Sequence, residues 1–208
     1  AEMLQTEPAL ANYKYYIENL VRLADHILPA EMEELLAKSR LATGTGATAF
    51  RSLVSADMQF PKITDGNGNE ATISEGNYLL NMTSPDRELR KNSFQGLMGT
   101  YHKYRNTLAS TLTGSCRTAN FYATAHKYPD TLTASLAADN IPTSLYDGLI
   151  QTVHDNLAPL HEYMQLKKDV LGFEELHPYD IYVPLSNAGD SFACDFEDAC
   201  GKITQALE

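Results

Sequence analysis

The pair His161-Glu162 is where this chain comes nearest to a metal-dependent catalytic motif. A zinc-peptidase helix carries H-E-x-x-H, because two histidines four residues apart share one helix face and can bind one ion. Here Gln165 occupies the position of the second histidine, and glutamine is a poor zinc ligand. His154 would lie about 10 Å from His161 along a helix axis, too far for both imidazoles to bind one ion. We therefore interpret both histidines as side chains of a packed helix rather than as ligands of one metal ion.

Two glycine-containing segments resemble ligand-binding loops only in part. The segment Asp65-Gly66-Asn67-Gly68-Asn69 starts like a calcium loop, which needs Gly at its sixth position and Glu at its twelfth. Those positions hold Glu70 and Gly76, so a hairpin turn is the better interpretation, since Asp-Gly and Asn-Gly favour positive φ. Gly44-Thr45-Gly46 resembles the start of a phosphate loop, but no strand precedes it and no Gly-Lys-Ser/Thr follows.

Side chains able to bind peptide groups gather at two places in the sequence, around His102 and after His177. Such side chains could line a channel for peptides. The candidate substrate-channel residues are Tyr101, Arg105, His177, Tyr179, Asp180 and Tyr182. The alternative is that the tyrosine rings pack in the interior while their hydroxyls find hydrogen-bond partners at the edge of the core.

The acidic composition argues against a nucleic-acid-binding protein. The 208 residues carry a formal net charge of −11, whereas binding to phosphates needs a basic face. No apolar run approaches the roughly 18–20 residues of a membrane-spanning helix, so we expect no membrane partner. Three cysteines without close pairing, Cys116, Cys194 and Cys200, suit a reducing compartment, so we expect a cytoplasmic protein.

The spacing of apolar residues predicts a mainly α chain with a small inserted β-hairpin. Helices are expected over residues 10–28, from Pro29, over 47–58 and 74–82, for about 40 residues from Pro85, from Pro142 and from Asp195, with the hairpin near 59–73. Pro159 should kink or restart the helix from Pro142. That helix and the last one should each bury an apolar face, and residues 177–184 should be extended. We expect residues 1–208 to form one multi-helix unit with long antiparallel helices.

Four segments carry a resemblance to a known family when they are taken together and in order. They are Ser84-Pro85-Asp86-Arg87-Glu88-Leu89-Arg90 with Phe94, then Ser135 to Ile141, Leu145 to Leu185, and Asp195-Phe196-Glu197-Asp198-Ala199. Within the third segment the most characteristic stretches are Leu160-His161-Glu162-Tyr163 and His177 to Leu185. Through these segments nearly the whole chain resembles oligoendopeptidase F, a branch of the thimet-oligopeptidase-like zinc metallopeptidases.

The resemblance implies that the intact protein is a zinc metalloendopeptidase that hydrolyses short oligopeptides. In that family the H-E-x-x-H helix and a downstream glutamate ligand come after the region matched here. Zinc therefore belongs to the intact enzyme, and this chain alone should be inactive. The chain should form a helical N-terminal wall of the substrate channel, with residues 186–208 leading into the missing C-terminal catalytic domain.

The end of the sequence agrees with a fragment of a longer protein, because it stops inside an apolar-periodic helix without a Gly or Asn cap. A fragment would expose apolar surface that normally packs on the catalytic domain, so we predict an apolar patch that favours self-association. One alternative is a free-standing helical protein-binding module without enzymatic activity. Another is a self-contained metalloenzyme that uses His154, His161 or His177, which the metal geometry disfavours.

Overall fold

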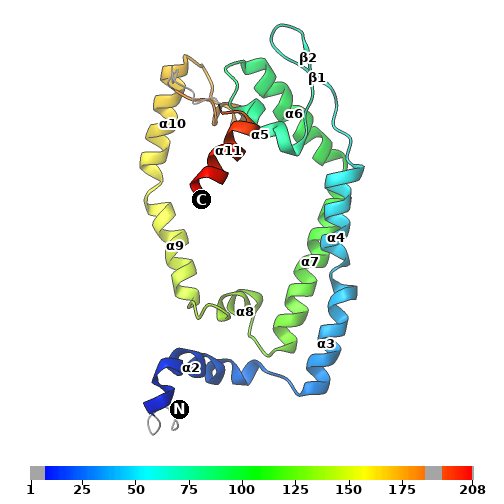
Figure 1. Cartoon of the computed structure of the whole chain (residues 1–208). Coiled ribbons are helices and arrows are strands. Elements are labelled where there is room, and N and C mark those ends of the chain that lie inside the picture. The colour runs from blue at the N-terminus through cyan, green and yellow to red at the C-terminus, as the bar shows by residue number, and fades with distance from the viewer. Residues whose placement is uncertain (1–7, 186–193, 208) are drawn as a thin grey trace.

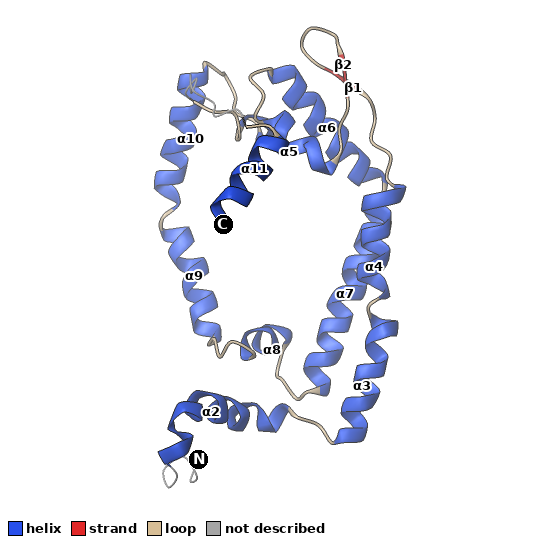
Figure 2. Ribbon diagram, in the orientation of Figure 1, coloured by secondary structure: helices blue, strands red, loops and turns tan. Residues whose placement is uncertain are grey.

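The computed structural model describes residues 8–185 and 194–207, and most of these residues are helical (Figures 1 and 2). The first part of the chain contains the 3-10 helix η1 (Pro8–Tyr13), α2 (Lys14–Leu23), the 3-10 helix η2 (Ala24–His26), α3 (Ala30–Thr43), α4 (Thr45–Ser52) and the π-helix η3 (Leu53–Asp57). After a hairpin come α5 (Glu75–Met82), α6 (Arg87–Lys103), α7 (Arg105–Ala125), α8 (Thr131–Ala137), α9 (Thr143–Asp155), α10 (Leu157–Leu171), the 3-10 helix η4 (Pro178–Asp180) and α11 (Phe196–Leu207). The prediction of a mainly α chain is confirmed. In these two described ranges, no helix is long and apolar enough to cross a membrane.

The helices are arranged as an elongated frame (Figure 1). On one long side α3 and α4 run antiparallel to α7, and α4 packs against α7. The other long side is formed by α9 and α10. The hairpin, α5 and α6 lie at one end of the frame, and α8 lies at the other, with α2 beyond it.

The predicted hairpin is confirmed. Strand β1 (Ile63–Thr64) pairs antiparallel with β2 (Glu70–Ala71). The paired residues are Ile63 with Ala71 and Thr64 with Glu70. Asp65 stabilises the turn because its Oδ1 accepts hydrogen bonds from the N–H groups of Asn67 at 2.9 Å and Asn69 at 2.8 Å. The Asp65 carboxylate thus bonds to backbone N–H groups within the turn, which agrees with the interpretation of this segment as a turn rather than a calcium loop.

A small apolar core joins the hairpin to α6. Ile63 and Ile73 are buried against Leu97 of α6. A Cβ at Gly96 would lie 2.6 Å from Cδ1 of Ile73, so α6 can approach the hairpin this closely only because the residue is glycine.

The prediction of one helix of about 40 residues from Pro85 is wrong. Two helices, α6 and α7, meet at Tyr104, whose φ of −98° and ψ of 10° leave the helical region. The Tyr104 N–H donates to the carbonyl of Tyr101 at 3.1 Å, which tightens the last turn of α6. Neither proline nor glycine occurs at this position, and the apolar spacing continues across it. The sequence pattern therefore gave no sign that the helix is interrupted.

The predicted interruption near Pro159 is confirmed. It falls at Asn156, where φ is −114° and ψ is 24°, between α9 and α10. Proline has no N–H to donate to the carbonyl four residues before it, and its ring clashes with that carbonyl in a regular helix. For Pro159 this carbonyl belongs to Asp155, the last residue of α9.

The prediction that residues 177–184 are extended is wrong, because they begin with the 3-10 turn η4. The Asp180 N–H donates to the carbonyl of His177 at 2.8 Å, and the His177 N–H donates to Oδ2 of Asp180 at 3.1 Å. This reciprocal pair closes the turn. A tight turn requires partners at i and i+3, which an apolar pattern does not reveal.

Three helices, α9, α10 and α11, carry apolar faces that the structure leaves exposed, against the prediction that these faces are buried. In α9 and α10 the exposed large apolar side chains are Leu145, Tyr146, Leu149, Ile150, Val153, Leu160, Tyr163, Leu166 and Val170. Helix α11 begins behind Asp195 as predicted, since the Asp198 N–H donates to Oδ1 of Asp195 at 2.8 Å, but α11 has no buried residue. Of residues 186–208, which were predicted to lead into a further domain, residues 186–193 and 208 lie outside the described residues.

Candidate functional site

The buried carboxylate of Asp180, in η4, forms ion pairs with two arginines from the first turn of α6, Arg87 and Arg90. Arg90 Nη2 donates to Oδ1 of Asp180 at 2.8 Å, and both groups are almost fully enclosed, with side-chain exposures of 1% and 0%. Arg87 donates from Nη2 to Oδ2 at 2.9 Å and from Nε to Oδ1 at 3.2 Å. Arg87 and Arg90 are three residues apart, so both point from the same helix face toward Asp180. We call Arg87, Arg90, Asp180 and Lys167 the buried ion cluster.

The arginines also bind backbone carbonyls around the cluster. Arg90 donates from Nε to the carbonyl of Tyr179 at 3.0 Å and from Nη1 to the carbonyls of Ser84 at 2.8 Å and Pro85 at 3.1 Å. The Arg87 guanidinium donates to the carbonyl of Glu175 and lies over the ring of Phe173, 4.0 Å from its centroid. The segment after α10 is therefore held to the start of α6 by charged hydrogen bonds and by aromatic contact.

The local sequence explains why Arg87 and Arg90 lie in the first turn of α6. Asp86 caps α6, since its Oδ1 accepts the N–H groups of Glu88 at 2.9 Å and Leu89 at 3.3 Å. The cap sets the first residue of the helix, and thereby the direction of the arginines in its first turn. Sequence reasoning did not single out these arginines as site residues. Two arginines three residues apart after Ser84-Pro85-Asp86 indicate a charged helix face, but no local pattern identifies Asp180, 90 positions beyond Arg90, as their partner.

The cluster carries more positive than negative charge. Burial alone would raise the pKa of Asp180, but hydrogen bonds from Arg87 and Arg90 outweigh it and hold the pKa below its usual range. The hydrogen bond to Asp180 raises the pKa of Arg87. Burial, and then the nearby charge of Arg90, lower the pKa of Lys167, whose Nζ donates to the carbonyl of Ile181 at 2.5 Å. Two arginines therefore pair directly with one carboxylate, and Lys167 adds a third basic group nearby without a hydrogen bond to Asp180.

The six candidate substrate-channel residues fall into two groups. Near η4, Tyr179 and Asp180 are buried, His177 is half-buried, and Tyr182 is exposed. Burial, and then the nearby charge of Tyr182, raise the pKa of Tyr78 of α5. Since Asp180 has no exposed surface and its oxygens are occupied, a direct contact with substrate does not fit its surroundings.

The other two candidates lie at the junction of α6 and α7. The Tyr101 hydroxyl donates to Oε1 of Glu75 of α5. Arg105 is exposed, and its Nη1 lies 2.9 Å from Nε2 of His102. The structure therefore brings Tyr101 and Arg105 to one helix junction, and it places the residues after His177 in a separate cluster.

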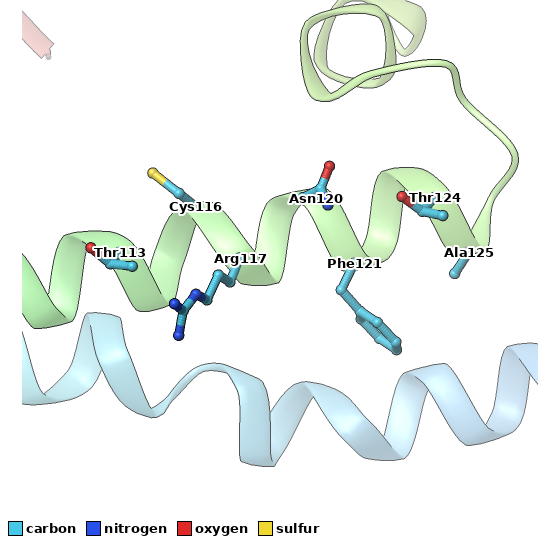
Figure 3. A pocket seen from close by; sticks show the side chains of 7 residues that line it. All are labelled: Thr113, Cys116, Arg117, Asn120, Phe121, Thr124 and Ala125. Carbon is cyan, nitrogen blue, oxygen red and sulfur yellow. The ribbon is translucent and has the colours of Figure 1, made fainter.

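Two surface grooves follow α7. The first, of about 620 Å³, is lined by one face of the helix: Thr113, Cys116, Arg117, Asn120, Phe121, Thr124 and Ala125. Figure 3 shows Arg117 and Phe121 pointing toward the neighbouring helix, while Cys116 and Asn120 point away from it. The second groove, of about 490 Å³, lies between α4 and α7 and includes Phe50, Leu108 and the candidate Tyr101. Both grooves are mainly apolar, so they are surfaces for packing rather than sites for acid–base chemistry.

The described residues do not fit a zinc site. In this part of the chain no group of three or more His, Cys, Asp or Glu side chains is placed to hold a metal ion. His154 and His161 are both exposed and lie on opposite sides of the break at Asn156. No catalytic step that uses a metal can therefore be derived from these residues.

Comparison with known proteins agrees with the observed fold and motif order. Residues 1–60 match the family described as Oligopeptidase F, and residues 80–204 match Peptidase family M3. The chain is 40% identical over 173 residues to Oligopeptidase PepF of Bacillus subtilis strain 168, which covers 83% of this chain and 26% of that protein. It is 37% identical over 200 residues to Group B oligopeptidase PepB of Streptococcus agalactiae, which covers 96% of this chain and 33% of that protein.

A solved structure shows the same arrangement of helices. The crystal structure of oligoendopeptidase-F from Enterococcus faecium superposes with a TM-score of 0.80 at 38% sequence identity, covering 90% of this chain and 37% of that one. The chain thus spans between a quarter and about two fifths of the length of these three relatives.

Proposed function

Because the chain belongs to peptidase family M3, in its oligoendopeptidase F branch, we propose that it is part of a zinc-dependent enzyme that hydrolyses short peptides. The observation that carries the proposal is the match of 96% of the chain to a third of a related oligopeptidase. The peptidases of this family depend on zinc. Since the described residues present no metal-binding cluster, the ligands and the general base belong to the part of the relatives' length that this chain does not span.

The proposed role of this part is to wall the substrate channel and to limit it to short peptides. Of the candidate channel residues, Tyr101, Arg105, His177 and Tyr182 keep accessible surface. Arg105, His177 and Tyr182 could donate hydrogen bonds to peptide carbonyls, whereas the Tyr101 hydroxyl already donates to Glu75 and could accept a hydrogen bond from a peptide N–H. Tyr179 and Asp180 are buried, so their proposed contribution is to hold the turn from which Tyr182 projects. A wall of this kind needs a fixed backbone, and the buried ion cluster supplies it.

The exposed apolar faces of α9 and α10 support a role within a larger protein. Leu149 is 63% exposed and Leu166 is 54% exposed, although both belong to the apolar face of their helix. Contiguous exposed apolar side chains usually mark an interaction surface. We assign these faces to contact with the missing C-terminal catalytic domain.

We also propose a cytoplasmic enzyme without nucleic-acid or membrane partners. The cysteines suit a reducing compartment, and the acidic composition disfavours binding to nucleic-acid phosphates.

The channel role can be tested in the full reading frame that contains this chain. Tyr182→Ala should raise KM for an internally quenched short peptide, because a contact with substrate is lost. Tyr16→Ala on α2, which removes a similarly exposed ring outside the candidate channel and outside the apolar faces of α9 and α10, serves as the matched control. Equal KM values for wild type and Tyr182→Ala would contradict the proposed contact.

The second candidate function is a free-standing helical binding module without catalytic activity. The exposed apolar faces of α9 and α10 favour it as well, since they would suit a protein partner. The two proposals differ in the reading frame beyond Glu208. A downstream H-E-x-x-H helix supports the peptidase, and a stop codon at that point supports the module.

A further inference from the structure

The N-terminal arm, residues 8–27, has few interactions with the rest of the described chain. Helices α2 and η2 contain no buried residue. The ion pair between Lys14 and Glu18 and the hydrogen bond from Arg22 to Asn19 stay within the arm. Of the hydrogen bonds, ion pairs and ring contacts within the described ranges, those that connect the arm to later residues all involve His26.

His26 and His126 form a reciprocal pair. His26 Nδ1 donates to the backbone carbonyl of His126 at 2.8 Å, and His126 Nδ1 donates to the backbone carbonyl of His26 at 3.0 Å. A carbonyl oxygen can only accept, so each Nδ1 must carry the proton. The His26 ring also stacks on Tyr128, with centroids 3.7 Å apart and planes 11° from parallel. His26 is therefore fixed by one hydrogen bond from its side chain, one hydrogen bond to its backbone carbonyl and one ring contact.

The residues after the arm are held separately. Leu28 is buried, and its N–H donates to Oε1 of Glu33 at 3.0 Å. The same Oε1 lies 3.7 Å from Nδ1 of His126. Since Leu28 is anchored on the frame side and the arm is attached through His26, the backbone between these two residues is the place where the arm can turn.

We propose that His26 and His126 form a latch that fixes the direction of the N-terminal arm relative to α7. With both hydrogen bonds formed, the arm holds one orientation. When the pair is broken, the arm swings about the backbone next to Leu28 while the helical frame stays folded.

The latch can be tested by measuring a distance between two spin labels on the chain. Native Cys116, exposed on α7, carries one label, and Glu18→Cys in the arm carries the other, with Cys194→Ser and Cys200→Ser removing competing sites. His26→Phe combined with His126→Phe keeps rings but removes both Nδ1–H donors. His26→Asn combined with His126→Asn keeps an N–H donor near each Nδ1 position. His161→Phe, at an exposed histidine of α10, is the control.

The latch predicts a narrow distance distribution for the parent and the His161→Phe control. The double Phe variant should show a broad distribution at unchanged helix content, and the double Asn variant should restore much of the narrow one. A narrow distribution in the folded double Phe variant, or a broad one in the parent, would overturn the proposal.

A measurement without any arm substitution remains decisive if the Phe variants fail to fold. The ¹⁵N chemical shifts of the two imidazoles in the parent chain should report the Nδ1–H form for both neutral rings. An Nε2–H form for either ring would exclude the reciprocal pair and with it the latch.

Discussion

Asp180→Asn should destabilise this chain more than any exposed charge substitution, because it leaves Arg90 buried without a counter-charge. The Arg90 guanidinium is 1% exposed and donates to Oδ1 of Asp180 at 2.8 Å. The amide of the variant would offer one neutral oxygen where the carboxylate accepts from Arg90, from two nitrogens of Arg87 and from the His177 N–H. Breaking a buried pair by removing one partner costs about 3–5 kcal/mol. We therefore expect the free energy of unfolding to fall by about that amount.

Urea denaturation followed by circular dichroism suits this test, because the chain has no tryptophan to report by fluorescence and its helices give a strong signal. Asp169→Asn is the matched control, since Asp169 is exposed and accepts one hydrogen bond from Gln165 Nε2 at 2.8 Å. It should change the free energy of unfolding by no more than about 0.5 kcal/mol. A loss below about 1 kcal/mol for Asp180→Asn would refute the assignment of the cluster as a buried ion pair.

The contribution of ionised Asp180 to the free energy of unfolding should also depend on pH in a definite direction. Because the folded-state pKa of Asp180 lies below its usual range, the ionised carboxylate stabilises the folded chain above the unfolded pKa of about 3.9. That stabilisation is lost as the pH falls through the lower folded-state pKa. The difference in stability between wild type and Asp180→Asn should therefore be constant above about pH 5 and should shrink below about pH 4. A difference that grows on acidification would contradict the stated cause.

Three further substitutions test packing and exposure. Gly96→Ala should cost about 1 kcal/mol, because its Cβ would lie 2.6 Å from Ile73 Cδ1, whereas Gly99→Ala meets no atom within 4 Å and should be neutral or stabilising in the same urea titration. Met82→Ala, at a fully buried side chain, should cost about 2–5 kcal/mol, against less than about 1 kcal/mol for Leu80→Ala, which is 73% exposed. Leu149→Glu on α9 should reduce self-association of the isolated chain in size-exclusion chromatography with light scattering; a wild-type chain that is monomeric at all concentrations would count against an apolar docking face.

Features set by a few neighbouring residues could be predicted from the sequence. The hairpin follows from Asp65 and the glycines beside it, and the break at Asn156 follows from Pro159, whose effect reaches only four residues back. The cap of α11 by Asp195 is equally local. Motif order along the chain was enough to indicate the family, because it depends on many positions rather than on one.

Features set by distant residues could not be predicted. Arg90 and Asp180 are 90 positions apart, so no local pattern joins them. Apolar spacing identified one face of α9 but did not reveal whether another helix covers it, and the structure leaves that face exposed. The reciprocal contact of His26 with His126 spans 100 positions and depends on how α7 ends, which no spacing rule specifies.

The central claim is that this chain forms part of a zinc-dependent oligopeptidase whose metal site lies outside the described residues. The most direct measurement is hydrolysis of an internally quenched short peptide by two purified proteins: the 208-residue chain and the product of the full reading frame that contains it. We expect no cleavage by the 208-residue chain alone, and cleavage by the full product that a chelator abolishes and zinc restores. Cleavage by the 208-residue chain, or cleavage by the full product that a chelator leaves unchanged, would show that the metal site is not where we propose it to be.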